Sequence, residues 1–231
     1  MVKNNRFDLM TAAIVSSALA DGETFVDVGA NWGYFTCIGS RRVGPSGLVL
    51  AIEPNWLAHH RLLETIHRER LVNVMPMPYA AYDSLGKPVS LVKSAFRQTT
   101  SSYVREDRIE GRFETLTSTL DYMVSKVAPG SVRLIKVDTE GAELPVMRGA
   151  RAILAEWKPL VILEVSEYSK RFGYAMDELY DYMTGLGYSR TYFIQDIPGE
   201  WKLWGPLTEV VEGQILFQHE RSDSAFPFSQ V

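Results

Sequence analysis

Short apolar runs alternate along the chain with longer segments in which apolar residues recur every three or four positions. The first pattern is typical of buried strands and the second of amphipathic helices. Strands are predicted at 24–28, 48–52, 132–137 and 160–165, and helices at 34–42, 55–70, 119–127, 143–156 and 176–186. This alternation predicts an α/β fold with a mainly parallel sheet and helices on both faces.

The less regular segments complete the predicted sheet. A third strand at 72–82 is interrupted by two prolines, which suits an edge or a bulge, and is expected to form a hairpin with 88–92. Two last strands at 188–194 and 214–217 are expected to pair antiparallel at one edge. Residues 93–111 are polar and lack periodicity, so we interpret them as a long functional loop, either a lid or a substrate loop.

The expected organisation is therefore a single main domain with short flanking segments. It comprises an N-terminal helix at 1–22, a main domain at 23–220 and a flexible tail at 221–231.

The segment 25–33, FVDVGANWG, carries the clearest chemical signal. A buried strand ends in Asp27, and the glycines Gly29 and Gly33 follow at the turn into a helix. A second acid, Glu53, ends the next apolar run. A glycine loop followed by a later acid predicts a nucleoside-binding βαβ unit, in which the acid accepts hydrogen bonds from ribose hydroxyls.

The spacing of this loop favours one nucleoside over another. A diphosphate-binding loop has the pattern G-x-G-x-x-G and no fixed negative charge beside it. Here the pattern is G-x-x-x-G, and Asp27 stands two residues before the first glycine. A carboxylate there suits an ammonium or a sulfonium group, so S-adenosylmethionine fits better than NAD.

Acidic residues also lie at the ends of two later strands, at Asp138 and Glu164. In an open parallel sheet the ligand binds at the carboxyl ends of the strands, so these acids are expected to share a rim with Asp27 and Glu53. Any one of them alone would be read as a helix cap or a solvated acid. In the segment KVDTEGAE, Lys136 must be paired or reach a polar rim because its strand is otherwise apolar.

Composition narrows the class of protein. A net charge of −4 argues against a general nucleic-acid binder, and a single cysteine with four histidines gives no disulfide framework or zinc cluster. Residues 1–20 do not resemble a secretory signal, and no apolar run reaches the roughly twenty residues that cross a bilayer. We therefore expect a cytoplasmic protein with no membrane or nucleic-acid partner.

Four segments in matching order resemble the FkbM family of methyltransferases: VDVGANWGYFT, IEP at 52–54, KVDTEGAE followed by VMRGA, and PLVILEV at 159–165. The resemblance spans about 24–187. It implies a class I Rossmann-like fold with a seven-stranded sheet, and methyl transfer from S-adenosylmethionine, usually to a hydroxyl oxygen. Family substrates include sugars and polyketide-type natural products.

The resemblance also assigns roles to individual residues. Those matching the cofactor site are Asp27, Gly29, Asn31, Gly33, Glu53, Pro54, Ala80 and Ala81, with Glu53 on the ribose, Pro54 against the adenine face and the two alanines near the adenine edge. Those facing the transfer site are Asp138, Glu140 and Glu164. The chain departs from the pattern at Thr139, where an aliphatic residue is common, and in its brief N-terminal region.

An aliphatic or sugar hydroxyl must lose its proton as the new bond forms. No histidine lies at a strand end, so a carboxylate is the expected base, with Asp138 first, Glu140 second and Glu164 third. Binding of Mg²⁺ is a rival use of these acids, and we do not favour a metal. The alternatives to a small-molecule or glycan O-methyltransferase are an NAD-dependent oxidoreductase, a non-catalytic nucleoside-binding module and a nucleic-acid methyltransferase.

Overall fold

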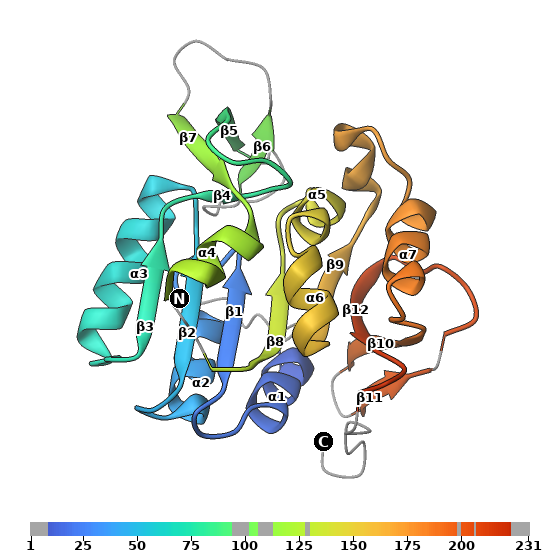
Figure 1. The fold of residues 1–231 in the computed structure, drawn as a ribbon, viewed down its shortest axis with the longest axis horizontal. Helices are drawn as coiled ribbons and strands as arrows, with labels where there is room; N and C mark the ends of the chain where they lie inside the picture. Colours follow the sequence, from blue (N-terminus) through green and yellow to red (C-terminus); the bar gives the residue numbers. More distant parts are fainter. Residues whose placement is uncertain are drawn as a thin grey trace.

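A large sheet lies between two layers of helices in the computed structural model (Figure 1). The structure describes residues 9–93, 102–105, 113–127, 130–197, 200–205 and 207–222. The sheet has eight strands in the order β11-β10-β12-β9-β8-β1-β2-β3. The predicted α/β fold with a mainly parallel sheet is confirmed. The predicted number of seven strands is too low, because an additional strand, β11, forms a hairpin with β10.

Five neighbouring strands of this sheet run parallel to one another. They are β1 (Thr24–Val28), β2 (Leu48–Ile52), β3 (Val74–Met77), β8 (Val132–Val137) and β9 (Leu160–Val165). The other three pair antiparallel, as predicted for that edge. They are β10 (Arg190–Ile197), β11 (Glu200–Trp204) and β12 (Gly213–Gln218).

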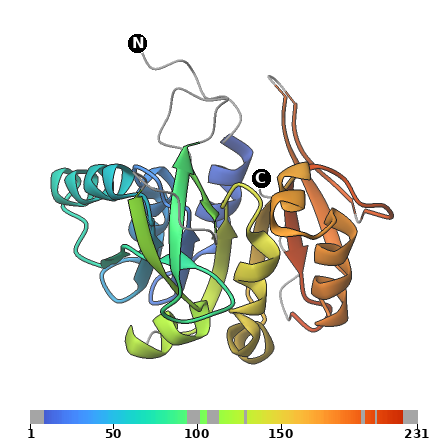
Figure 2. The same cartoon turned by 90° about the horizontal axis from the view of Figure 1, so that it is seen from above.

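The helices divide between the two faces of the large sheet (Figure 2). One face is covered by α1 (Leu9–Ala18), α2 (Tyr34–Val43) and α3 (Trp56–Arg68). The other is covered by α4 (Leu120–Val127), α5 (Glu143–Arg148), α6 (Arg151–Trp157) and α7 (Met176–Gly185). The helix predicted at 143–156 is thus two helices, separated at Gly149 and Ala150. Within the described residues, no helix combines the length and the apolar character needed to cross a membrane.

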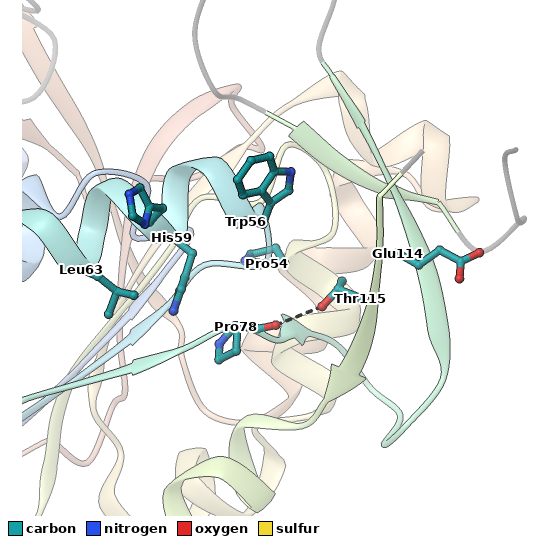
Figure 3. A pocket seen from close by; sticks show the side chains of 8 residues that line it. Pro54, Trp56, His59, Leu63, Pro78, Glu114 and Thr115 are labelled. Atoms are coloured by element: carbon teal, nitrogen blue, oxygen red, sulfur yellow. Dashed lines mark hydrogen bonds between the residues drawn. The ribbon is translucent and has the colours of Figure 1, made fainter. Parts of the chain in front are cut away.

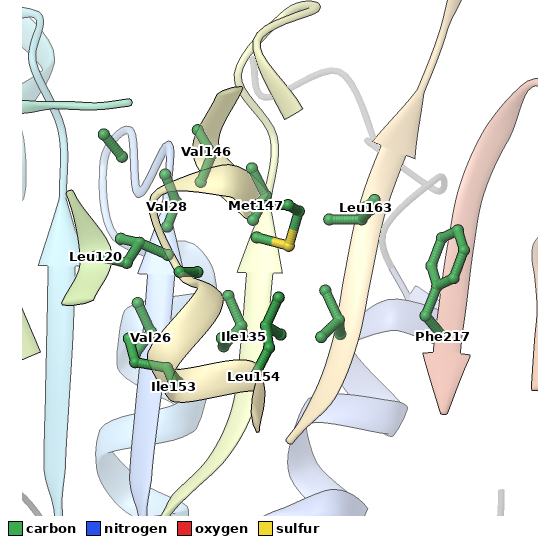
Figure 4. Close-up of a cluster of buried hydrophobic side chains, with 14 of the residues drawn as sticks. Val26, Val28, Leu120, Ile135, Val146, Met147, Ile153, Leu154, Leu163 and Phe217 are labelled. Atoms are coloured by element: carbon green, nitrogen blue, oxygen red, sulfur yellow. The ribbon is translucent and has the colours of Figure 1, made fainter. Parts of the chain in front are cut away.

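Branched and long apolar side chains fill the space between the sheet and the second helix layer. Val26, Ile135 and Leu163, from three neighbouring strands, pack with Ile153 and Leu154 of α6 (Figure 4). Strands that are buried on both faces read as continuous apolar runs, which is why these strands were predictable from sequence. This packing holds the strand ends, and the residues that follow them, in fixed positions.

A second, smaller sheet has the strand order β4-β7-β5-β6 and stands near the carboxyl ends of the parallel strands (Figure 1). Its strands are β4 (Ala80–Ala81), β5 (Pro88–Lys93), β6 (Ser102–Arg105) and β7 (Phe113–Ser118). Three expectations are wrong here. The segment 72–82 contributes to two sheets, 88–92 pairs with β7 and β6 rather than with 72–82, and part of 93–111 is strand.

The two ends of the chain lie largely outside the described residues. The N-terminal helix expected at 1–22 is observed as α1 from Leu9, and 1–8 are not described. Of the tail expected at 221–231, only Arg221 and Ser222 are described.

Candidate active site

The glycine loop joins β1 to α2 and lies directly against the end of β8. Gly29 has φ 77°, and a Cβ atom built there would stand 2.0 Å from the backbone oxygen of Asp138. The backbone N–H of Asp138 donates to the carbonyl of Val28 at 3.1 Å. Only glycine fits this close approach in a left-handed conformation. The loop and the acidic turn after β8 are therefore one packed unit.

Asp27 lies beneath the loop rather than in an open crevice, since its side chain is fully buried. Its Oδ2 accepts a hydrogen bond from Thr36 Oγ1 at 2.6 Å, while Oδ1 has no hydrogen-bond partner among the described residues. Burial raises the pKa of Asp27, and the neighbouring Lys136 opposes that rise. Asp27 thus places a buried carboxyl group under the loop, and direct contact with a cofactor stays a prediction.

Glu53, which follows β2, is held by the backbone on both sides. Its Oε2 accepts from the N–H of Asn31 at 2.9 Å, and its Oε1 accepts from the N–H of Asn55 at 2.8 Å. Burial raises the pKa of Glu53 to about 7, and these two hydrogen bonds oppose the rise. Each carboxylate oxygen has two lone pairs, so both oxygens retain the capacity to accept from a ribose hydroxyl.

The carboxyl ends of the parallel strands form one edge of the sheet, with β1 and β2 in one half and β8 and β9 in the other. In the β8–β9 half, Asp138 and Glu164 stand side by side. Val137 and Leu163 are paired in register across β8 and β9, and the two acids are the next residues. The charge of Asp138, followed by burial and by hydrogen bonding to Asp138, raises the pKa of Glu164 to about 10. Lys136 Nζ lies 3.4 Å from Asp138 Oδ2.

The turn after β8 carries two more glutamates with different roles. Glu140 sits at φ 58°, and its charge adds to the rise in the pKa of Glu164. Glu143 is buried, and its Oε1 accepts from the N–H and Oγ1 of Thr139 and from the N–H of Gly141. Burial raises the pKa of Glu143 to about 7. Glu143 fixes the turn that carries Asp138 and Glu140.

A family model described as the methyltransferase FkbM domain matches residues 27–190, which include both halves of this edge. The chain belongs to the FkbM methyltransferase family. The expected resemblance is thereby confirmed over most of the chain. A comparison with curated protein sequences finds no match.

Solved structures show the same fold as this FkbM protein. The methyltransferase FkbM from Methylobacillus flagellatus KT is 18% identical with a TM-score of 0.53, covering 87% of this chain and 47% of that one. The present sequence thus spans about half the length of that relative. A putative methyltransferase from Streptococcus mutans in complex with S-adenosylhomocysteine is 10% identical with a TM-score of 0.52, covering 94% and 99%. A putative rRNA methylase from Clostridium thermocellum is 10% identical with a TM-score of 0.52, and the match covers 94% of this chain and 95% of that one.

An open groove of about 370 Å³ lies beside the residues that follow β2 (Figure 3). Pro54, Trp56 and His59 line one side, and Pro78 and Thr115 line the other. Contact of Pro54 with an adenine face stays a prediction.

The side chains of Ala80 and Ala81 are buried in two different apolar clusters. Their backbones pair with Thr117 and Ser118 of β7. Contact of either alanine with adenine stays a prediction.

Strand β6 connects the two halves of the edge, a feature that the sequence did not reveal. The Nδ2 of Asn55 donates to Ser102 Oγ at 3.1 Å on the cofactor side. On the acid side, the Arg171 guanidinium lies 4.5 Å from the ring centre of Tyr103 and 3.9 Å from that of Tyr168. Tyr103 and Arg171 are far apart in sequence, so no local pattern indicates this stacking.

Tyr174 supports the acidic turn. It is buried, and its hydroxyl donates to the carbonyl of Gly141 at 2.6 Å. Within the described part of the chain, no three His, Cys, Asp or Glu side chains converge as a metal site would require. The expectation that no metal is used stays a prediction.

Proposed function

We propose that this methyltransferase transfers the methyl group of S-adenosylmethionine to a hydroxyl of a small molecule or glycan. The observation that carries the proposal is the position of Asp138. Its side chain is 35% exposed, while the Lys136 side chain that contacts it is 3% exposed. A carboxylate that is paired with a buried cation and is itself partly exposed to solvent can receive a proton from an acceptor.

The residues of the cofactor half fit S-adenosylmethionine. Glu53 would hold the ribose hydroxyls, Pro54 would contact the adenine, and the loop from Gly29 to Gly33 would surround the methionine portion. The carboxyl group of Asp27 lies buried beneath the loop, and one of its oxygens has no hydrogen-bond partner among the described residues. A carboxyl group at this place favours a cationic ligand over a diphosphate. The solved relative in complex with S-adenosylhomocysteine supports the same cofactor.

The cofactor would supply a methyl group already activated by a positively charged sulfur. The protein therefore has two tasks, which are to align the acceptor oxygen with that methyl and to receive the hydroxyl proton. Alignment alone contributes about 7–11 kcal/mol in model reactions. Asp138 would receive the hydroxyl proton of the acceptor during this transfer. Glu140 and Glu164 are the second and third candidates for this role.

The acceptor class is supported by charge and chemistry. The net charge of −4 and the acidic edge disfavour a nucleic-acid backbone, although one structural relative bears the name of a putative rRNA methylase. Membership of a methyltransferase family argues against the NAD-dependent oxidoreductase. A non-catalytic nucleoside-binding module remains the second candidate, because the cofactor half alone would support binding.

Mass spectrometry tests the proposal directly. The purified chain is incubated with S-adenosylmethionine and a panel of sugars, polyketides and other hydroxyl compounds, and products heavier by one methylene are sought. Calorimetric titration with S-adenosylhomocysteine and with NAD is the companion experiment. We expect binding of the first and methylation of at least one acceptor. Binding without methylation of any acceptor would favour the non-catalytic module, and binding of NAD alone would refute the proposal.

A further inference from the structure

Lys136 is a buried cation in an otherwise apolar strand. The residue is 2% exposed, and its ammonium lies 4.7 Å from the ring centre of Phe35 on α2. Such a charge is tolerated inside a protein only when it is paired. The pairing is with Asp138 Oδ2, at 3.4 Å. Because Lys136 is enclosed, it acts on its neighbours and not on an acceptor.

The proximity of Asp138 and Glu164 has a chemical consequence. Two ionised carboxylates at neighbouring positions repel each other, and one proton held by the pair relieves that repulsion. Asp138 and Glu164 come directly after Val137 and Leu163, which are paired in register, and the charge of Asp138 raises the pKa of Glu164 to about 10. At neutral pH the pair therefore carries one proton and one negative charge.

The surrounding charges decide which carboxyl group holds the proton. The ammonium of Lys136 contacts Asp138, whereas Glu164 faces the negative charges of Asp138, Glu140 and Glu143. On its other side, Glu164 is opposite Gln214 of β12, which accepts a hydrogen bond from Thr11 of α1. The negative charge is favoured on Asp138 and the proton on Glu164.

The β1 side adds one more negative group. Asp27 is paired in register with Lys136 across β1 and β8. The charge of Asp138, followed by that of Asp27, raises the pKa of Lys136. Lys136 therefore stays charged beneath the edge. Burial alone would act in the opposite direction.

We propose that Lys136 is a positioning residue that keeps Asp138 ionised and leaves Glu164 as the protonated partner, so that the pair presents a single base to the acceptor. This inference rests on the proposed function in assigning Asp138 as that base. Before transfer the pair holds one proton, on Glu164. After transfer it holds two, because the acceptor's proton has moved to Asp138 while Glu164 keeps its own.

Infrared spectroscopy of the purified protein tests the location of the proton without turnover. At about pH 9, below the pKa of about 10 for Glu164, we expect a protonated-carboxyl band. Glu164→Gln should lower the intensity of the band by one carboxyl group, because the amide can donate to Asp138 but carries no carboxyl proton. Glu167→Gln, at a partly exposed glutamate three residues later, is the matched control and should leave the intensity unchanged. The buried Asp27, whose pKa is also raised by burial, contributes equally to the band in all of these proteins. A band of unchanged intensity in Glu164→Gln would overturn the placement.

Lys136→Met tests the positioning role through the pH profile of methyl transfer with an acceptor found as above. Without the ammonium, Asp138 should hold a proton more tightly, so the acid limb of the profile should move up by at least about one pH unit. Lys136→Arg should largely restore the original limb. A merely structural defect would lower the rate at every pH and leave the limb in place, and that result would overturn the role of Lys136.

The infrared experiment and the methylation experiment together distinguish a failure of this inference from a failure of the proposed function. If the infrared band behaves as expected but no acceptor is methylated, the proton placement stands and the proposed function fails. If acceptors are methylated but the band keeps its full intensity in Glu164→Gln, the proposed function stands and the inference fails. Circular dichroism of each variant shows whether the fold is retained, and Glu164→Gln, which changes a single atom type, is the decisive variant if Lys136→Met does not fold.

Discussion

The two halves of the carboxyl edge satisfy their acids in different ways. At the β1–β2 half, both oxygens of Glu53 accept hydrogen bonds from backbone N–H groups. At the β8–β9 half, Asp138 and Glu164 are satisfied by each other and by the ammonium of Lys136. Backbone donors keep their protons at every ordinary pH, whereas carboxyl and ammonium groups can exchange theirs. The first half is therefore suited to binding and the second to proton transfer.

Asp138→Asn should give the largest effect and should separate the two halves. Loss of a positioned base lowers turnover by about 10²–10⁴-fold, while binding of S-adenosylhomocysteine should change by less than about threefold. Methylation rates and calorimetric titration measure the two quantities. Asp177→Asn in the first turn of α7 is the control and should change neither. Equal losses in the methylation rate and in S-adenosylhomocysteine binding would show that binding and proton transfer are not assigned to separate halves.

Gly29→Ala tests the contact through which the halves are packed together. A methyl group at Gly29 would overlap the backbone oxygen of Asp138, so we expect the free energy of unfolding to fall by about 2–4 kcal/mol. Gly86→Ala is a matched control, since Gly86 has a similar φ of 73° but open space around it. It should cost only about 1 kcal/mol, as expected for the conformation alone. Equal costs in urea unfolding would mean that the contact with Asp138 contributes nothing.

The sequence predicted the parallel strands of the two halves better than the small sheet that connects them. The apolar runs at 24–28, 48–52, 132–137 and 160–165 match β1, β2, β8 and β9 residue for residue, because these strands are buried on both faces. The acids that follow them were therefore expected at one edge. Burial of Asp27 was not predictable, since it depends on how the loop folds over it.

The small sheet was the main failure of sequence reasoning. Residues 88–92 pair with β7 and with β6, and both partners lie in a polar stretch with weak alternation. Register between strands that are distant in sequence is set by packing and not by local pattern. The same holds for the pairing of Lys136, where two interpretations were open until the distance to Asp138 decided between them.

Glu53→Gln sharpens the comparison on the binding side. Losing the carboxylate should weaken S-adenosylhomocysteine binding by about tenfold, which is about 1.4 kcal/mol, with little change in the maximal rate. Because burial raises the pKa of Glu53 to about 7, the wild-type affinity should rise as the pH increases from about 6 to about 8 and the carboxylate forms. The variant should lose this dependence. A wild-type affinity that does not vary with pH in calorimetry would contradict the assignment.

Arg171→Gln should have the smallest effect, because β6 is tied to the two halves by separate contacts. On the acid side, stacking of the guanidinium on Tyr103 and Tyr168 at exposed positions contributes about 0.5–1 kcal/mol, which the variant should lose in urea unfolding. Binding of S-adenosylhomocysteine should be unaffected, since Ser102 still contacts Asn55 on the cofactor side. If binding of S-adenosylhomocysteine weakens together with stability, the contacts of β6 with the two halves would depend on each other and would not be separate.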